Sequence, residues 1–480
     1  MDGAREVAAI AQNQEPMSTM PEQQSVGVVE NFGVERQSEP AESGSTPEGS
    51  RFQNLLRWAT KGGLAIVDQG LISGANFLLG ILLARWLAPD QYGAYALAFS
   101  AFLLLSFLYY PLLLEPMAVF SGSAYSRCLR GYLKSLVWIH VAITVVTVVV
   151  LGAAAFVAFY RHAPGGLPGA LLGVTIASPC ILLFWLARRA YYMELAPARA
   201  ATGALLYCVL VVSGTYFLFR VGRLSPFTAY VLMATGALTT GLYLMFHIRN
   251  RLPALEAGPT PRETWTRHWS YGRWALAAAI ATWIPYYMYY PLVTSFFGMA
   301  QAGQLRALMN FALPMEQTFT ALSCLFLPYA ARIQAQQGRR SAGLLTRRIT
   351  AIYVVGAIAY WLVFMPFKAQ AFHFLYAGKY TEVAYLIPYV ALETILWSAS
   401  FGPAIVLRAM ESSISIFYAR CVASVLSLAV GIPLTHAYGL WGAMVGIVLA
   451  NAAALVVTLY ILRSKIAEGR PVSAVQPETA

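Results

Sequence analysis

The sequence predicts an all-α membrane protein that crosses the bilayer about twelve times. Three observations support this fold class. The 480 residues are 58% hydrophobic and only 11% charged, with a mean hydropathy of +0.59, whereas soluble globular domains are about 25% charged. Apolar runs near or above the ~17–25 residues of a membrane helix recur along the chain. Basic residues alternate between two sets of loops.

Twelve apolar segments follow one another after residue 63. The links between them are too short to hold a soluble catalytic domain, so we do not expect an enzyme. The segments are 64–86, 93–118, 135–160, 169–187, 200–219, 226–248, 271–295, 302–327, 349–367, 384–406, 414–435 and 440–462.

Lys and Arg give the predicted orientation. Of the 31 basic residues after residue 50, 24 lie in the links or near the segment ends on one side of the predicted membrane, and seven lie on the other side. Cytoplasmic loops of membrane proteins carry the excess of Lys and Arg, so both termini are predicted to be cytoplasmic. This distribution also accounts for the net charge of +12, and we infer no nucleic-acid partner from it.

The segments divide into two predicted lobes. Residues 51–248 form an N-lobe with helices 1–6, and residues 271–465 form a C-lobe with helices 7–12, joined by a cytoplasmic linker at 249–270. Transporters often contain such internal repeats, and Gln91-x-Gly93 is echoed by Gln301-x-Gly303. Residues 1–50 hold nine of the 21 acidic residues and few apolar ones, which predicts a disordered tail. Residues 466–480 form a C-terminal tail. The five cysteines and six histidines lack ligand spacing, so we expect no metal or other cofactor.

The first two segments carry a resemblance to a known family. They contain Asp68-Gln69-Gly70, Ser73, Phe77, Leu82-Leu83-Ala84-Arg85, Leu87, Pro89, Tyr92-Gly93 and Tyr95-Ala96-Leu97. Three shorter stretches add to it: Arg188-Arg189-Ala190-Tyr191-Tyr192, Tyr271-Gly272-Arg273, and Gly439 with Gly442-Ala443. Over roughly residues 55–465 the chain resembles the Wzx-type oligosaccharide flippases, polysaccharide-biosynthesis transporters related to the multidrug/toxin extruders and the lipid II flippases.

The resemblance implies two six-helix lobes around a central cavity in the cytoplasmic (inner) membrane. It implies alternating-access transport of a lipid-linked oligosaccharide, such as a polysaccharide or O-antigen (lipopolysaccharide) precursor on an undecaprenyl-pyrophosphate-type carrier. A multidrug/toxin cation antiporter of the same superfamily is the first alternative. A membrane glycan polymerase or ligase is the second, although such enzymes usually need a larger external loop than this chain has.

Two arginines are candidates for binding substrate phosphate, since a guanidinium binds phosphate in a bidentate manner. Arg306 lies a few residues inside the eighth segment, and Arg85 ends the first. The alternative is an interfacial arginine that reaches the lipid headgroups, or for Arg85 a pair with Asp90.

Two carboxyl groups are candidates for coupling transport to H⁺ or Na⁺. Glu316 and Glu393 lie deep in their segments, where a charge is costly and therefore faces protein or water. Pro314 and Pro388 precede them and predict kinked helices. A structural hydrogen bond between helices is the alternative.

Two further carboxyl groups, Asp68 and Glu115, lie on the two arms of the first hairpin. We expect them to form gating or structural contacts with each other or with Lys61. Tyr286, Tyr287 and Tyr290 of the seventh segment are candidates for sugar stacking. An aromatic belt at the outer membrane surface is the alternative reading of these tyrosines.

Overall fold

The computed structural model describes residues 47–194, 196–249, 251–252, 257–337, 342–410 and 414–468, and every regular element in those ranges is a helix. The chain divides into a small unit, Met1–Arg57, which holds the start of α2, and a compact unit, Trp58–Ala480, which holds the remaining helices and the site. Residues 1–46 of the predicted N-terminal tail lie outside the described residues. Residues 47–50, its last four, are helical. Beyond Glu468 the predicted C-terminal tail also lies outside them.

The N-lobe helices follow the predicted segments closely. They are α2 (Pro47–Trp86), α3 (Pro89–Tyr109), the π-helix η1 (Tyr110–Leu114), α4 (Glu115–Ser121), α5 (Leu129–Tyr160), α6 (Leu167–Met193), α7 (Pro197–Arg220) and α8 (Pro226–Arg249). Pro89, Pro197 and Pro226 stand in the first turns of their helices. Proline suits that position because its fixed φ is helical and its missing N–H would have no partner there.

The C-lobe contains shorter pieces. They are α9 (Pro261–Tyr287), α10 (Tyr289–Phe297), α11 (Met299–Met309), α12 (Leu313–Gln337), α13 (Ala342–Phe364), η3 (Met365–Phe367), α14 (Lys368–Tyr376), η4 (Thr381–Leu386), α15 (Ile387–Ala399), α16 (Phe401–Ala409), α17 (Ile414–Leu426), the π-helix η5 (Ser427–Gly431) and α18 (Ile432–Glu468). Pro314 and Pro388 stand in the first turns of α12 and α15. The predicted kinks are therefore helix starts, and the eighth span is broken between α11 and α12.

Within the predicted linker, 249–270, α9 begins at Pro261. A capping box fixes this start. The Glu263 N–H donates to Thr260 Oγ1 at 3.2 Å, and the Thr260 N–H donates to Glu263 Oε2 at 2.8 Å. The bond from the Thr260 N–H lowers the pKa of the Glu263 carboxyl below its usual range.

By length and hydropathy, nine helical stretches in the described ranges could cross a membrane. One of them, Ile414–Ala467, is 54 residues long and holds two spans, divided where Gly439 adopts φ +60° and ψ −136°. The two predicted segments outside this set are 271–295 and 302–327, which become α9–α10 and α11–α12. With Ile414–Ala467 counted as two spans and these two segments added, the helices fit the predicted layout of twelve spans.

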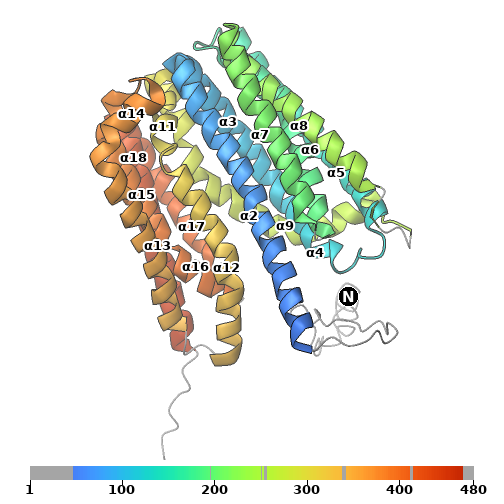
Figure 1. Cartoon of the computed structure of the whole chain (residues 1–480). Helices are drawn as coiled ribbons and strands as arrows, with labels where there is room; N and C mark the ends of the chain where they lie inside the picture. The colour runs from blue at the N-terminus through green and yellow to red at the C-terminus, as the bar shows by residue number, and fades with distance from the viewer. Residues whose placement is uncertain are drawn as a thin grey trace, which may run out of the picture. The chain divides into compact units, whose positions relative to one another are not determined.

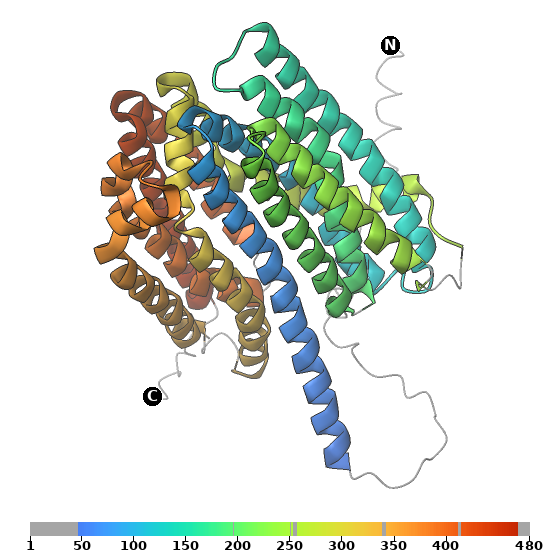
Figure 2. The same ribbon diagram turned by 45° about the horizontal axis from the view of Figure 1, so that its top comes forward.

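Two groups of helices make up this unit, α3–α8 and α10–α18, and α2 runs between them in both views (Figure 1 and Figure 2). α3 packs against α11, which joins the lobes at the predicted outer side. α9 contacts η1 and α5 of the N-lobe and α17 of the C-lobe. Buried His268 fixes α9 to the N-lobe, with Nε2 2.8 Å from the Tyr132 hydroxyl and Nδ1 3.0 Å from the Leu112 carbonyl oxygen.

Candidate functional site

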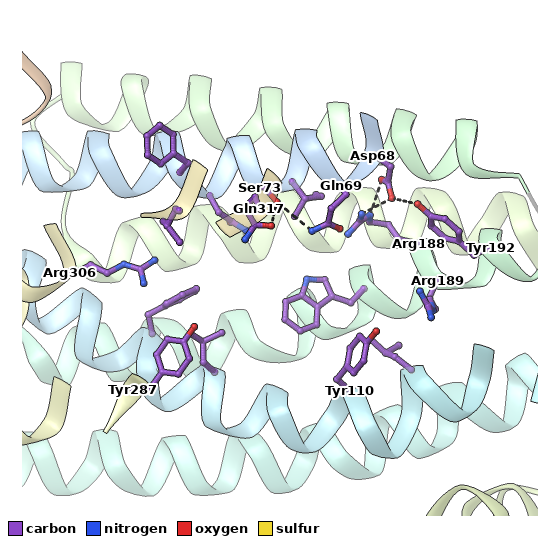
Figure 3. A pocket seen from close by; sticks show the side chains of 18 residues that line it. Asp68, Gln69, Ser73, Tyr110, Arg188, Arg189, Tyr192, Tyr287, Arg306 and Gln317 are labelled. Carbon is purple, nitrogen blue, oxygen red and sulfur yellow. Dashed lines mark hydrogen bonds and ion pairs between the residues drawn. The ribbon is translucent and has the colours of Figure 1, made fainter. Parts of the chain in front are cut away.

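A cavity of about 410 Å³ lies between the lobes. α2, α3, η1 and α6 line it from the N-lobe, and α9, α11 and α12 line it from the C-lobe. Its lining on α2 runs from Asp68 to Phe77, which spans about 13 Å at 1.5 Å per residue. Its polar and charged lining residues, most of them labelled in Figure 3, are Asp68, Gln69, Ser73, Asn76, Tyr110, Arg188, Arg189, Tyr192, Tyr287, Arg306 and Gln317.

The cytoplasmic end of the cavity is built around a buried ion pair (Figure 3). Arg188 of α6 donates through Nε to Asp68 Oδ1 at 3.1 Å and through Nη2 to Oδ2 at 2.6 Å, and the Tyr192 hydroxyl donates to Oδ2 at 2.7 Å. Asp68 is 1% exposed, and the Arg188 side chain is 12% exposed. Asp68 was predicted to contact Glu115 or Lys61; its hydrogen bonds are with Arg188 and Tyr192, and the guanidinium engages both carboxylate oxygens. The side chain of Lys61 lies outside the described residues.

Arg189 lies beside this pair and also lines the cavity. Its guanidinium carbon is 6.0 Å from the centre of the Tyr192 ring. Within the described part of the chain, its buried Nε has no hydrogen-bond partner. Glu115 of α4 lies within electrostatic range of Arg189 but is not a lining residue.

Arg306 of α11 occupies the opposite end of the cavity (Figure 3). Its guanidinium carbon lies 5.1 Å from the centre of the Phe99 ring, which is a cation–π distance. The phenol groups of Tyr287 and Tyr290 are among its electrostatic neighbours. Its buried Nε has no partner among the described residues. Arg306 is thus, after Arg189, the second chamber guanidinium with an unused donor, and it lies at the opposite end from Arg189.

Neutral polar groups lie between the two charged ends. Ser73 Oγ donates to Gln317 Oε1 at 2.7 Å, which links α2 to α12 across the lobes. Gln69 Nε2 donates to Ser73 Oγ at 3.4 Å. The Trp185 ring also lines this section. Amide, hydroxyl and aromatic groups of this kind suit sugar hydroxyls and pyranose faces.

An apolar cavity of about 460 Å³ adjoins this chamber between α2 and α12. Both cavities share five lining residues: Gln69, Ser73, Phe77, Leu313 and Gln317. Beyond these shared residues, the lining of the apolar cavity includes Gly70, Gly74, Pro314 and Leu322. We call this second cavity the α2–α12 groove. It gives the chamber an apolar side branch.

The predicted coupling residues lie outside the chamber, within the C-lobe. Glu393 is 1% exposed; its Oε1 accepts a hydrogen bond from Asn451 Nδ2 at 3.1 Å, and its Oε2 has no partner among the described residues. The Tyr286 hydroxyl donates to Asn451 Oδ1 at 2.7 Å. Glu316 and Arg420 are electrostatic neighbours of Glu393. Tyr286 therefore belongs to this polar cluster, and only Tyr287 of the three predicted tyrosines lines the chamber.

Arg85 lies away from the chamber lining. Its Nη1 donates to the carbonyl oxygen of Phe374 at the end of α14, 2.6 Å away. Lys379, which follows α14, adds two hydrogen bonds to the end of α2. Its Nζ donates to the carbonyl oxygens of Arg85 and Leu87 at 2.9 and 2.7 Å. We call these three hydrogen bonds the outer latch. It joins the end of α2 to the C-lobe.

Sequence reasoning missed Arg188 and Arg189 as site residues. They were counted as loop charges after a span ending at residue 187, whereas α6 continues to Met193. One signal was available: after Pro179, no proline interrupts the chain until Pro197, so a helix could extend past the arginines. In the described ranges no group of three or more His, Cys, Asp or Glu side chains could hold a metal ion.

Comparison with known proteins finds solved structures with a similar fold. No protein-family model matches the chain, and no curated protein sequence matches it. Among solved structures, an inward-facing multidrug resistance MATE family transporter of the MOP superfamily aligns with a TM-score of 0.71 at 13% identity, over 84% of this chain and 98% of that one. The lipid II flippase MurJ in an inward closed conformation aligns with a TM-score of 0.64 at 11% identity, over 83% and 87%.

A MOP superfamily transporter from Pyrococcus furiosus aligns with a TM-score of 0.61 at 14% identity, over 85% of this chain and 94% of that one. At such identities the likeness concerns architecture. The chain has the two-lobed helical fold of MOP superfamily transporters. The neighbours include both MATE transporters and a lipid II flippase, so the substrate has to be argued from the side chains of this chain.

Proposed function

We propose that this protein moves a lipid-linked oligosaccharide across the cytoplasmic membrane by alternating access. The observation that carries the proposal is the combination of a cationic chamber with the apolar α2–α12 groove beside it. A lipid-linked sugar has a polar anionic head and a hydrocarbon tail. It needs both environments at once, because the head cannot enter hydrocarbon at low cost.

The charge of the chamber favours an anionic head. Its charged lining residues are Arg188, Arg189, Arg306 and Asp68, and Asp68 is already paired with Arg188. The guanidinium groups of Arg189 and Arg306 each keep an unpartnered Nε within the described residues. Guanidinium groups with free donors suit the phosphate oxygens that join the sugar to its lipid carrier.

The α2–α12 groove favours a lipid tail over a second polar group. Beyond the residues it shares with the chamber, its lining is formed by glycine, proline, leucine and one threonine, Thr318. α2 and α12 come from different lobes, so a substrate can lie with its head inside and its tail between the helices. The Glu393 cluster then serves as the coupling site for H⁺ or Na⁺, since a buried carboxylate with an unused oxygen can bind either ion.

A multidrug cation antiporter is the second candidate. Glu316 and Glu393 favour it, because buried carboxyl groups are the natural partners of cationic substrates. These groups lie outside the chamber lining, however, where the arginines outnumber the one aspartate. A cationic drug would therefore meet a repulsive chamber, and we rank this function below the flippase. A glycan polymerase or ligase ranks third.

A deletion strain separates these functions. Without the protein, lipid-linked sugars are expected to accumulate in the cytoplasmic leaflet, and the wild-type gene should restore their export. Arg306→Ala should fail to restore it. Arg161→Ala, which changes an exposed outer arginine, should restore it fully and is the control. Normal lipid-linked sugars in the deletion strain, together with altered drug sensitivity, would instead support the antiporter.

A further inference from the structure

We propose that Arg188 and Arg189 form an inner diphosphate site and that Asp68 is its displaceable counter-ion. This inference rests on the proposed function, and it assigns the first binding step to residues at the cytoplasmic end of the chamber. The ligand class is a prenyl diphosphate head, with or without its sugar. Arg306 is then the second phosphate site, at the outer end of the same chamber.

The position of the two arginines supports a shared ligand. Adjacent residues on a helix point about 100° apart, yet Arg188 and Arg189 both line the chamber. Arg188 extends toward α2, where it meets Asp68, and Arg189 points away from that pair (Figure 3). The two guanidinium groups therefore flank the space at the chamber's inner end. A diphosphate, with two phosphate groups, fits a pair of separated guanidinium groups better than a single phosphate does.

The hydrogen-bond inventory supplies a second, independent observation. A guanidinium has five N–H donors, and the pairing with Asp68 uses Nε and one donor of Nη2 of Arg188. Arg189 Nε is buried without a partner among the described residues. Buried donors are nearly always satisfied in native proteins, so an orphan that lines a polar cavity points to a ligand.

Asp68 gives this inner site a means of release. Its carboxylate holds Arg188 in the same two-pronged geometry that a phosphate would use. A bound diphosphate must therefore compete with Asp68, while the Tyr192 hydroxyl remains available to Asp68 when Arg188 turns away. Arg306 lies within electrostatic range of Glu316, but Glu316 does not line the chamber, and no carboxylate in the described part of the chain forms an ion pair with Arg306. The substrate thus passes from a site where a paired carboxylate has to be displaced to one where none has to be, which favours movement outward.

Asp68→Asn is the direct test, because it keeps the size of the side chain and an acceptor for Tyr192. Binding is measured in nanodiscs by calorimetry with farnesyl diphosphate, and farnesol serves as the uncharged probe. Asp68→Asn should tighten diphosphate binding about tenfold and lower the transport rate, and Arg189→Gln should weaken binding about tenfold. Arg220→Gln, at the exposed end of α7, is the matched control.

Removing Arg188 alone leaves Asp68 buried and unpaired, which threatens the fold. The double variant Asp68→Asn with Arg188→Gln avoids this, and it should bind diphosphate less tightly than Asp68→Asn alone. The inference is overturned if wild type binds the diphosphate more tightly than farnesol, while Asp68→Asn and Arg189→Gln each bind the diphosphate with the same affinity as wild type. If wild type shows no preference for the diphosphate and no export of lipid-linked sugars, the proposed function itself fails.

Discussion

Gly93 of α3 and Gly303 of α11 pack against each other in a reciprocal contact between the lobes. A Cβ added to Gly93 would lie 1.8 Å from the carbonyl oxygen of Met299, and one added to Gly303 would lie 2.8 Å from that of Pro89. Each glycine thus meets the carbonyl four residues before its counterpart. Such a contact is expected beside a pseudo-two-fold axis. It gives the echo of Gln91-x-Gly93 in Gln301-x-Gly303 a physical meaning.

Gly93→Ala should hold the outer ends of the lobes apart, since the new methyl group would overlap the backbone of α11. We expect an outward-open bias and a large loss of transport. The measurement uses Asn76→Cys in a variant lacking the five native cysteines, labelled from outside with an impermeant maleimide. Labelling should rise with Gly93→Ala. Gly122→Ala, whose added Cβ meets nothing within 4 Å, should not change it, and equal labelling in both would contradict the packing argument.

Lys379→Met should weaken the outer latch. It removes two hydrogen bonds to the Arg85 and Leu87 carbonyl oxygens, worth about 1 kcal/mol each at a partly exposed site. We expect a smaller rise in the same cysteine labelling than Gly93→Ala gives. Lys368→Met, on the same predicted side, is the control. Unchanged labelling in Lys379→Met would show that the latch does not hold the outer side closed.

Gly74→Trp should fill the α2–α12 groove while leaving the charged ends of the chamber intact. A Cβ at Gly74 meets nothing within 4 Å, so the larger side chain has room at its base. Transport of a long-chain lipid-linked sugar should fall severalfold. Binding of a short, water-soluble prenyl diphosphate should be unchanged. If long-chain transport and short-chain binding fall by the same factor, the lipid tail lies elsewhere. Gly74→Ala, which adds only a methyl group, is the control.

Glu393→Gln should uncouple transport from its driving ion. Glutamine keeps a carbonyl acceptor for Asn451 but cannot carry the negative charge that binds H⁺ or Na⁺. We expect transport in proteoliposomes to lose its dependence on an imposed pH or sodium gradient, with substrate binding retained. The control is Glu263→Gln, which changes an exposed carboxyl at the start of α9. Full gradient dependence in Glu393→Gln would assign coupling to another group.

The sequence was sufficient to predict the spans, because length, apolar content and the charge of the links act locally along the chain. The segments 271–295 and 302–327 were recognised by the same apolar content, although the structure divides each of them between two helices. The partner of Asp68 could not be predicted in this way. Arg188 lies 120 residues further on, and only the tertiary fold, which places α6 within side-chain reach of α2, brings the two together.

The same reasoning explains the mixed outcome for the site. Arg306 and Tyr287 line the chamber, as depth along a span suggested. Arg85 looked similar by depth, but its direction depends on the position of α14, which no local pattern indicates. Arg189 was assigned to a loop because the predicted span ended at residue 187, six residues before the end of α6 at Met193.

The most direct test of the central claim uses the purified protein in proteoliposomes. A fluorescent prenyl-diphosphate oligosaccharide is placed in both leaflets, and the fraction reached by an external quencher is followed over time. Wild type and Arg220→Gln should exchange the lipid between leaflets, while Arg306→Ala should slow exchange about 10- to 100-fold, the loss expected for charge-assisted hydrogen bonds to phosphate. Equal exchange by wild type and Arg306→Ala, or none above empty liposomes, would contradict a phosphate-binding flippase.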